Sequence, residues 1–323
     1  MKTPLRALEP ALQHYGVKAS AARQIHEGFN YHFQLTTSAG EKRLIVFRRQ
    51  PGKPPRDFQF NLWQHMRAGG FTLIPPTLKT ASGRDYAGTP LGTVALVDWV
   101  PGQSGSTHRD WSGPLLSDAA GVLADLHAAV RDFRPERAGA DQLAPLYLPA
   151  DAWVDRSEAL FADFCDRTAP TAGVADAVRM QMQGARDRFD GAAYRTALEA
   201  GTAVVHGDYR PGNLVLDDGR IVGVLDLDAA FWESRVYDVA YAAFQFAGDE
   251  GVYPQPSAAT AVDFVRHYTQ RWPLTPAERA LLPFFLRQVV LKRLLAGHDT
   301  EPRLALLEQL DNGLEEDLVR AAA

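Results

Sequence analysis

The feature that most constrains this chain is the stretch AVVHGDYRPGNLVLDDGRIVGVLDLDAAFWESRVYDVA at residues 203 to 240, in which short apolar runs end in acidic residues. One run leads into Asp208, and later runs lead into Asp226 and Asp228. Apolar runs of this length, separated by turn residues, are typical of buried strands. Because each strand ends in a carboxylate, the stretch predicts a cluster of acidic side chains at one edge of a small sheet.

The spacing of the acidic and amide side chains within this stretch indicates the kind of reaction that they can support. Asn213 follows Asp208 at the fifth position, and the turn Asp217-Asp218-Gly219 predicts a hairpin that returns Asp226 to the side of Asn213. Magnesium-assisted phosphoryl transfer requires a side chain that takes a hydroxyl proton, together with an amide oxygen and a carboxylate that hold a hard cation. We therefore predict a kinase in which Asp208 is catalytic and Asn213 and Asp226 bind Mg²⁺.

The same stretch resembles a known family. The pattern HGDxxxxN, followed by DLDxA and by Tyr237-Asp238, is similar to the aminoglycoside phosphotransferase and choline kinase superfamily, and less similar to the protein kinases. Within the superfamily it most resembles the type II homoserine kinases and the stress-response kinases. The resemblance is specific over residues 203 to 240 and diffuse elsewhere, where EGFN, LVDWVPG and AAGVLADLH are weaker signs.

The resemblance implies an α+β fold with two lobes, similar to that of the protein kinases. A small β-rich lobe that binds the nucleotide would cover residues 1–100, and a larger helical lobe that binds the acceptor would cover residues 103–323, with the hinge near 97–102. The length of 323 residues also favours two lobes over a single core. ATP and Mg²⁺ are the expected cofactors.

Nucleotide contacts are expected at three places in the first lobe. Gly28, in HEGFN, would let a loop approach the phosphates, although one glycine also fits an ordinary turn. Val97 and Trp99 lie in the expected hinge, where backbone groups would meet the adenine. These hinge contacts follow from the resemblance, because backbone contacts leave little trace in a sequence.

The third strand departs from the family's pattern. Kinases of this kind place a Lys there to hold the phosphates, whereas LIVFRRQ contains none. Arg48 is the best substitute by position and Arg49 the next, while Phe47 can instead occupy the position itself. An Arg clamps phosphate oxygens with two donors but has a different reach from Lys; the two arginines also fit a solvated strand end. The next helix, residues 55–68, carries Asp57 where the family usually has a pairing Glu.

Structural support is expected from residues around the acidic cluster. Asp238, near a helix start, can bond backbone donors and stabilise the catalytic loop, and His206 is expected to stabilise that loop rather than transfer protons. Asp228 can contact the metal or the acceptor, or only cap a turn. His127 is expected to be a packing residue, and Cys165 a half-buried thiol that forms no disulfide.

Bulk properties favour a cytoplasmic enzyme. The composition, 46% hydrophobic and 23% charged, is ordinary for a globular protein, and neither a long apolar run nor a signal peptide is present. Residues 1–100 hold 13 Lys and Arg against 6 Asp and Glu, whereas residues 101–323 hold 21 against 33. A basic first lobe suits nucleotide phosphates. No nucleic-acid or membrane partner is expected, and the oligomeric state stays open.

The motif does not identify the acceptor hydroxyl. Homoserine is the first expectation, followed by an amino alcohol such as choline, an aminoglycoside, or a protein Ser or Thr. Glu233, Asp249 and Glu250 follow the catalytic strands and could bind an ammonium group. A nucleotide-binding pseudokinase is the rival interpretation, favoured by the missing strand Lys and disfavoured by the intact acidic motif. A protein kinase lacks support because GxGxxG, DFG and APE are absent, and ATP is not distinguished from GTP.

Overall fold

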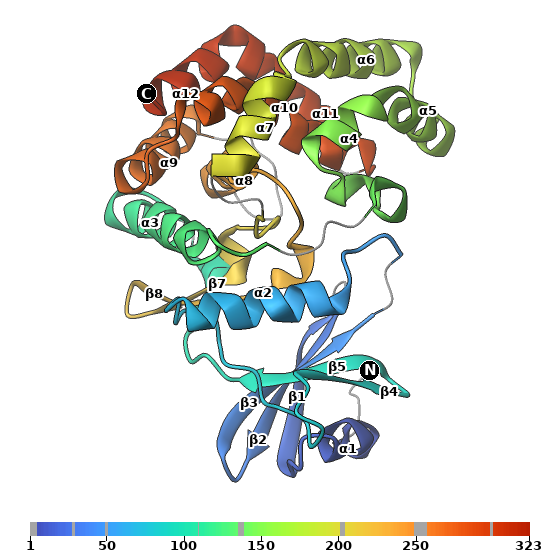
Figure 1. Cartoon of the computed structure of the whole chain (residues 1–323), viewed down its shortest axis with the longest axis vertical. Helices are drawn as coiled ribbons and strands as arrows, with labels where there is room; N and C mark the ends of the chain where they lie inside the picture. The colour runs from blue at the N-terminus through green and yellow to red at the C-terminus, as the bar shows by residue number, and fades with distance from the viewer. Residues whose placement is uncertain are drawn as a thin grey trace.

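The computed structural model describes residues 5–27, 30–48, 51–108, 110–134, 139–200, 204–248, 257–297 and 300–323. A smaller lobe built on an antiparallel sheet precedes a larger helical lobe, and helix α2 (Arg56–Ala68) lies at the junction between them (Figure 1). This arrangement confirms the expected α+β fold with two lobes. None of the described helices is both long and apolar enough to span a bilayer.

Five antiparallel strands form the sheet of the smaller lobe, in the order β1-β2-β3-β5-β4. Their bounds are β1 Ala19–Glu27, β2 Tyr31–Thr37, β3 Gly40–Phe47, β4 Tyr86–Thr89 and β5 Gly92–Asp98. In the β3–β5 pair, Arg43 lies opposite Val97 and Phe47 lies opposite Thr93. The end of β5, from which the chain leaves the sheet, is therefore beside the start of β3.

The side chains of β3 alternate between the two faces of this sheet, because a strand has a period of two residues. Leu44 and Val46 pack on the outer face, in a core shared with α1 (Leu5–Gln13). Ile45 and Phe47 pack on the inner face, in a core that continues through α2 into the helical lobe. The inner face of the sheet is therefore the face that lines the space between the lobes.

Helices build most of the larger lobe. Their bounds are α3 Gly113–Ala129, α4 Ala150–Asp155, α5 Ser157–Thr168, α6 Ala172–Asp187, α7 Gly191–Ala200, α8 Val236–Ala247, α9 Ala258–Arg271, α10 Pro276–Leu295, α11 Thr300–Gln309 and α12 Glu315–Ala321. Helix α10 is central, because α5, α6, α7, α8, α11 and α12 all pack against it. Cys165, on α5, is a half-buried free thiol, as expected.

A second, three-stranded sheet carries the acidic stretch. Its strands are β6 Gln103–Ser104, β7 Leu214–Asp217 and β8 Arg220–Val224. The expected hairpin is present between β7 and β8, and its turn residues Asp218 and Gly219 have φ values of 45° and 72°, as a tight turn between twisted strands requires. Strand β6 pairs with β7, so the segment that follows β5 joins the acidic hairpin. We propose that the lobe boundary lies at residues 99–102, between β5 and β6.

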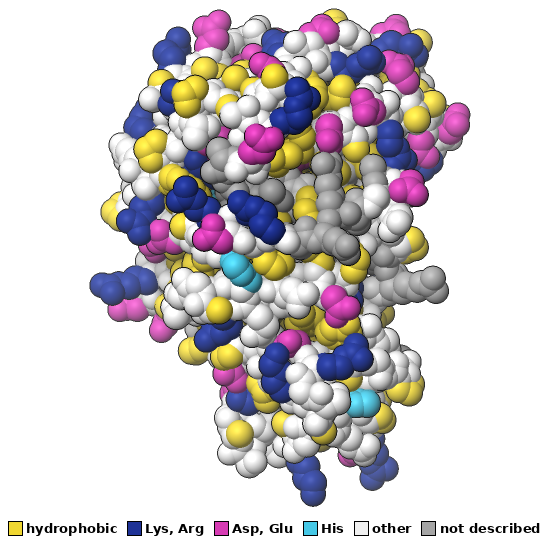
Figure 2. Space-filling model, viewed as in Figure 1, with side chains coloured by type: hydrophobic (Ala, Val, Ile, Leu, Met, Phe, Trp, Pro, Cys, Tyr) yellow, Lys and Arg dark blue, Asp and Glu magenta, His cyan; other side chains and the backbone are white. Residues whose placement is uncertain are grey.

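Charged side chains of both signs are interspersed on the face of the molecule that Figure 2 shows. The excess of Lys and Arg in residues 1–100 does not gather there into a patch of one sign. The smaller lobe therefore has more Lys and Arg than Asp and Glu without a concentrated basic binding surface on this face.

A buried ion pair fixes the start of α10 against the start of α8. The guanidinium of Arg235 donates to both carboxylate oxygens of Glu278, at 2.6 and 2.8 Å, and both side chains are almost fully buried. Glu278 also completes a capping box with Thr275 at the start of α10. Burial alone would raise the pKa of Glu278, but Arg235 and Thr275 lower it below the ordinary value. The pair therefore ties two helix termini into one unit.

We predict that Glu278→Ala lowers the free energy of unfolding by about 3–5 kcal/mol, because it leaves a buried guanidinium without its counter-ion. Urea denaturation at neutral pH measures this loss. Since the pKa of Glu278 is lowered, the wild-type contribution is present above the ordinary carboxyl range and is lost as the pH falls through the lowered pKa. The exposed Glu316→Ala on α12 is the control, expected to cost less than about 1 kcal/mol. Equal losses for the two variants would contradict this account.

Candidate active site

The loop that carries Asp208 is held by the carboxylate of Asp238, in the first turn of α8. The backbone N–H of His206 donates to Asp238 Oδ2 at 2.6 Å, and that of Gly207 donates to Oδ1 at 2.9 Å. On its other side Asp238 Oδ2 accepts from Nε2 of His127, at 3.1 Å, and all of these groups are buried. His127 is thus a buried packing residue, as expected, but it also orients Asp238.

The ring of His206 links the Asp208 loop to the strand that precedes Asp226. Its Nδ1 accepts from the backbone N–H of Asp208 at 3.3 Å, so Nε2 carries the proton and donates to the carbonyl of Leu225 at 3.0 Å. Gly207, between them, has φ of 78°, and a Cβ there would lie 2.2 Å from the carbonyl oxygen of Ala229. The loop can therefore approach the acidic turn this closely only with glycine at this position.

Four donors surround the carboxylate of Asp208. Oδ1 accepts from the hydroxyl of Tyr241 at 2.5 Å and from Arg293 Nη2 at 2.9 Å. Oδ2 accepts from Arg210 Nε at 3.1 Å and from Asn213 Nδ2 at 3.0 Å. Burial alone would raise the pKa of Asp208, but the two guanidinium groups and the tyrosine hydroxyl lower it below its usual value. Asp208 is therefore an ionised, tightly oriented hydrogen-bond acceptor at neutral pH.

Asn213 and Asp226 lie beside this carboxylate. Asn213 Nδ2 donates to the Asp208 backbone carbonyl at 2.8 Å as well as to its side chain, so the amide oxygen points away from Asp208. The backbone carbonyl of Asn213 accepts from the N–H of Leu225 at 2.8 Å, which places Asp226 next in the chain. The structure thus brings together the three residues that the motif singled out.

Asp226 carries a negative charge that its surroundings oppose. Its backbone is left-handed, with φ of 64°, and its carboxylate accepts from the N–H of Asp228 at 3.3 Å. Burial and the neighbouring carboxylates of Asp228 and Asp208 raise its pKa. A hard cation held between Asp226 and the amide oxygen of Asn213 would relieve this repulsion. In the described residues no group of three or more His, Cys, Asp and Glu side chains is arranged to hold a metal, so water or nucleotide oxygens would complete the coordination.

Asp228 joins the two lobes instead of facing solvent. Its carboxylate accepts from Asn30 at 3.0 Å and forms ion pairs with Lys53 and Arg56. Gln59 of α2 donates to its backbone carbonyl at 2.9 Å. Burial alone would raise the pKa of Asp228, but the two cations and Asn30 lower it. The acidic turn of the larger lobe is thus fixed to the loop and helix that follow β3.

The basic residue of β3 that faces the cleft between the lobes is Arg43, rather than Arg48. Arg43, Ile45 and Phe47 share the inner face and line this cleft, in keeping with the strand's period of two. Arg48 is exposed, its backbone N–H donates to Asn30 at 3.2 Å, and its guanidinium lies 5.5 Å from the centre of the Tyr31 ring. Arg48 therefore lies just beyond the end of β3 and outside the lining of the cleft, and its role at the phosphates stays a prediction.

The remaining lining of the cleft includes part of the expected hinge. Val97 lines it, together with His32, Trp63, Pro75, Leu225, Leu227, Asp226 and Asp228. Trp99 is not part of this lining, and its backbone N–H donates to the carbonyl of Glu41 at 3.4 Å. Gly28, Arg49, Asp249 and Glu250 lie outside the described residues.

Two acidic residues that the sequence singled out, Asp57 and Glu233, have surroundings that differ from those expected. Asp57, on α2, accepts from the hydroxyl of Tyr86 at 2.6 Å rather than from a strand cation. Glu233 is fully buried, and burial raises its pKa to about 7 against the opposing charge of Lys292. Burial likewise lowers the pKa of Lys292 to about 7. Glu233 is therefore enclosed in the helical lobe and does not present a surface carboxylate to an ammonium group.

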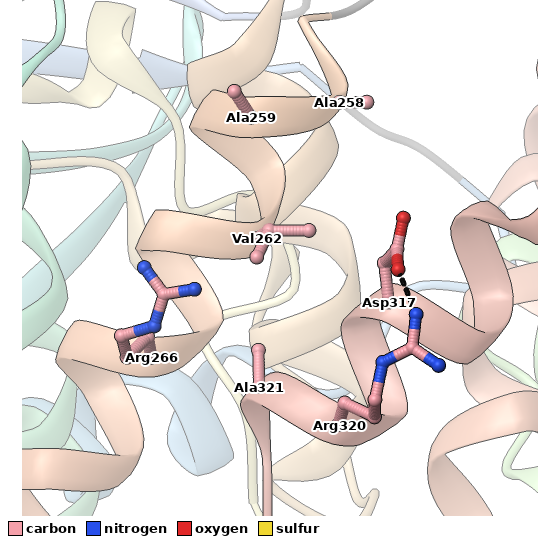
Figure 3. A pocket seen from close by; sticks show the side chains of 7 residues that line it. All are labelled: Ala258, Ala259, Val262, Arg266, Asp317, Arg320 and Ala321. Atoms are coloured by element: carbon pink, nitrogen blue, oxygen red, sulfur yellow. Dashed lines mark hydrogen bonds and ion pairs between the residues drawn. The ribbon is translucent and has the colours of Figure 1, made fainter.

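Tyr241 and Arg293 were not expected from the sequence. Tyr241 stands three residues after Asp238, on the same face of α8, and this helical spacing was the available signal. Arg293 is on α10, 85 positions away from the carboxylate that it contacts, so no local pattern indicated it. A separate surface hollow between α9 and α12, which Figure 3 shows, is lined by Val262, Arg266, Arg320 and neighbouring residues and contains none of the residues around Asp208.

Comparisons with known proteins agree with this geometry. The model of the phosphotransferase enzyme family matches residues 21–284. A homoserine kinase of Xanthobacter autotrophicus is 27% identical over 275 residues, which cover 82% of this chain and 76% of that protein. A solved aminoglycoside phosphotransferase from Alicyclobacillus acidocaldarius covers 100% of this chain and 96% of its own, with a TM-score of 0.64 and 17% identity. An amicoumacin kinase solved with AMP-PNP covers 96% and 92%, with a TM-score of 0.64 and 16% identity.

The family match extends from the first strand of the smaller lobe into α10. It therefore includes both lobes, the loop of Asp208 and the acidic turn. The solved structures share the fold, and the resemblance inferred from the HGDxxxxN motif is confirmed. The chain belongs to the phosphotransferase enzyme family and is a small-molecule phosphotransferase whose acceptor is an alcohol group.

Proposed function

We propose that this enzyme transfers the γ-phosphoryl group of Mg·ATP to a small-molecule hydroxyl, with homoserine as the acceptor. The observation that supports this most is the contact between Asp208 Oδ2 and Asn213 Nδ2, at 3.0 Å, beside the hairpin that leads to Asp226. The homoserine kinase of Xanthobacter autotrophicus supports the acceptor, and the AMP-PNP complex of amicoumacin kinase supports the nucleotide.

In this proposal Asp208 orients the acceptor hydroxyl toward the γ-phosphorus and receives its proton. The bonds from Tyr241 and Arg293 hold Oδ1, so we assign the hydroxyl to Oδ2, where the bonds from Arg210 and Asn213 are 3.1 and 3.0 Å long. A lowered pKa makes Asp208 a weak base. A weak base suits phosphoryl transfer. In a loose transition state the bond from the γ-phosphorus to ADP is largely broken while the acceptor hydroxyl still holds most of its proton.

Asn213 and Asp226 would hold Mg²⁺. The cation would neutralise charge on the phosphate oxygens as the phosphoryl group moves. The raised pKa of Asp226, caused by burial and by the carboxylates of Asp228 and Asp208, supports this assignment, since a cation at Asp226 offsets that repulsion. Asp238 and His206 would act through the backbone of the loop, as positioning residues.

The charges around Asp208 favour an acceptor that carries a carboxylate. Arg293 and Arg210 both contact Asp208, and the side chain of Arg293 is 24% exposed, so an acceptor placed at Asp208 lies within reach of guanidinium groups. Guanidinium groups bind carboxylates and repel ammonium groups. This environment suits the amino acid homoserine better than choline or an aminoglycoside, whose charges are positive.

We predict that Asp208→Asn lowers kcat by about 10²- to 10⁴-fold, because the acceptor loses its proton acceptor and its orienting charge. Acceptor-dependent release of ADP in the presence of homoserine measures this. Asp217→Asn, an exposed residue at the end of β7, is the matched control and should keep wild-type turnover. Wild-type turnover in the Asp208 variant would remove this residue from the mechanism.

For Asp226→Asn we expect the affinity for Mg·ATP to fall by at least about 10- to 100-fold, since one anionic ligand of the cation is lost. Asn tolerates the left-handed backbone at this position, so the fold should be retained. Asp218→Asn is a control with the same substitution in the same backbone conformation. Calorimetric titration measures both; an unchanged Mg²⁺ requirement in the Asp226 variant would refute the metal assignment.

The acceptor preference can be tested with 3-amino-1-propanol, which is homoserine without its carboxylate. The kcat/KM of the wild type should be about 10- to 100-fold higher for homoserine than for 3-amino-1-propanol. This ratio corresponds to the loss of one charge-assisted hydrogen bond to the carboxylate. Arg293→Gln should reduce this preference, whereas the exposed Arg271→Gln on α9 should preserve it. A preference for the amine without the carboxylate would contradict the assigned acceptor class.

A further inference from the structure

The family resemblance implies a phosphate-binding Lys on β3, whereas the second half of this strand, LIVF at residues 44–47, contains none. Phe47 is the last inner-face residue of this strand, and it lines the cleft. The guanidinium carbon of Arg56, the first residue of α2, lies 4.0 Å from the centre of the Phe47 ring. A cation from α2 therefore lies over the aromatic residue that ends β3.

A second cation comes from the loop between β3 and α2. Lys53 and Arg56 each form an ion pair with Asp228, one on each carboxylate oxygen. The two cationic side chains are 10% and 19% exposed, and the Asp228 side chain is 4% exposed, so these charges are largely shielded from water. Charges shielded in this way interact strongly with any anion that reaches them.

These cations lie close to the proposed metal ligand. Lys53 forms an ion pair with Asp228, whose backbone N–H donates to the Asp226 carboxylate at 3.3 Å. The ammonium group of Lys53 is also 5.8 Å from the centre of the Tyr147 ring. Lys53 is thus at the edge of the acidic cluster, on the side of the smaller lobe.

Arg43 does not take this place. It lies opposite Val97, at the end of β3 that adjoins the expected hinge, and its Nε donates to His32 Nδ1 at 3.1 Å. Phe47 lies at the other end of the strand, four positions from Arg43 along the β3–β5 ladder and next to Arg56. The two ends of β3 therefore have separate cations.

We propose that Lys53 and Arg56 bind the phosphate groups of the nucleotide, and that Asp228 is their counter-ion when the nucleotide is absent. This inference rests on the proposed function and adds the residues that replace the strand Lys. Both side chains donate to oxygen anions: Arg56 in a forked geometry, Lys53 as a point charge. The phosphate oxygens exchange with the Asp228 carboxylate, while Gln59 keeps its bond to the Asp228 backbone.

The test compares ATP with adenosine, which has the same base and sugar but no phosphates. Binding of each, with Mg²⁺, is measured by calorimetric titration for the wild type, Lys53→Gln, Arg56→Gln and the exposed control Lys79→Gln. Each of the first two variants should bind ATP about 10- to 100-fold more weakly and should keep its adenosine affinity. Lys53→Arg, which retains the charge, should recover most of the ATP affinity, and Lys79→Gln should match the wild type.

Two results would overturn the inference. Unchanged ATP affinity in both Gln variants would show that the phosphates lie elsewhere. An equal loss of ATP and adenosine affinity would show that Lys53 and Arg56 only hold the two lobes together. In both cases a wild type that phosphorylates its acceptor would leave the proposed function intact. A wild type that binds no Mg·ATP would overturn the proposed function and this inference together.

Discussion

Two hydrogen bonds from the backbone of His206 and Gly207 to the carboxylate of Asp238 hold the geometry on which the rest of the site depends. Asp238 is itself fixed by His127, and His127 by the hydroxyl of Tyr268, at 2.8 Å. Tyr268 accepts from Arg235, whose buried partner Glu278 caps α10; these buried groups form one connected set. A buried polar network is stable only when its members are paired. The position of Asp208 therefore depends on the packing of the helical lobe that holds this network together.

The same principle of paired buried charge governs the junction between the lobes. Asp226 and Asp228 stand two residues apart, and their surroundings push their pKa values in opposite directions. Asp228 has two cations from the smaller lobe, whereas Asp226 has carboxylate neighbours that oppose its charge. One carboxylate therefore joins the lobes, and the other is suited to a mobile cation. This division of roles needs only the short turn between β8 and α8, in which the backbone of Asp226 is left-handed.

The sequence predicted those parts of the site that are local in the chain. The step from Asp208 to Asn213, the hairpin turn at Asp218 and the helix start at Asp238 each depend on neighbours within a few residues. Arg293, Lys53 and Arg56 could not be predicted in this way, because their partners are 85 to 175 positions away and are brought together by packing. The position of Arg48 depends on a different feature, the register of β3. The sequence did not fix where the strand ends, whereas in the structure Leu44 and Val46 alternate with Ile45 and Phe47 between the two faces, and Arg48 follows the last strand residue.

The central claim is that Asp208 receives the acceptor while Asn213 and Asp226 hold the metal. The most direct test is a crystal structure with AMP-PNP, homoserine and Mn²⁺, whose anomalous scattering locates the cation independently of the protein density. The account predicts Mn²⁺ in contact with the Asn213 amide oxygen and the Asp226 carboxylate, and the homoserine hydroxyl within hydrogen-bond distance of Asp208 Oδ2. A cation bound away from both of these residues, or an acceptor whose hydroxyl is remote from Asp208, would contradict it.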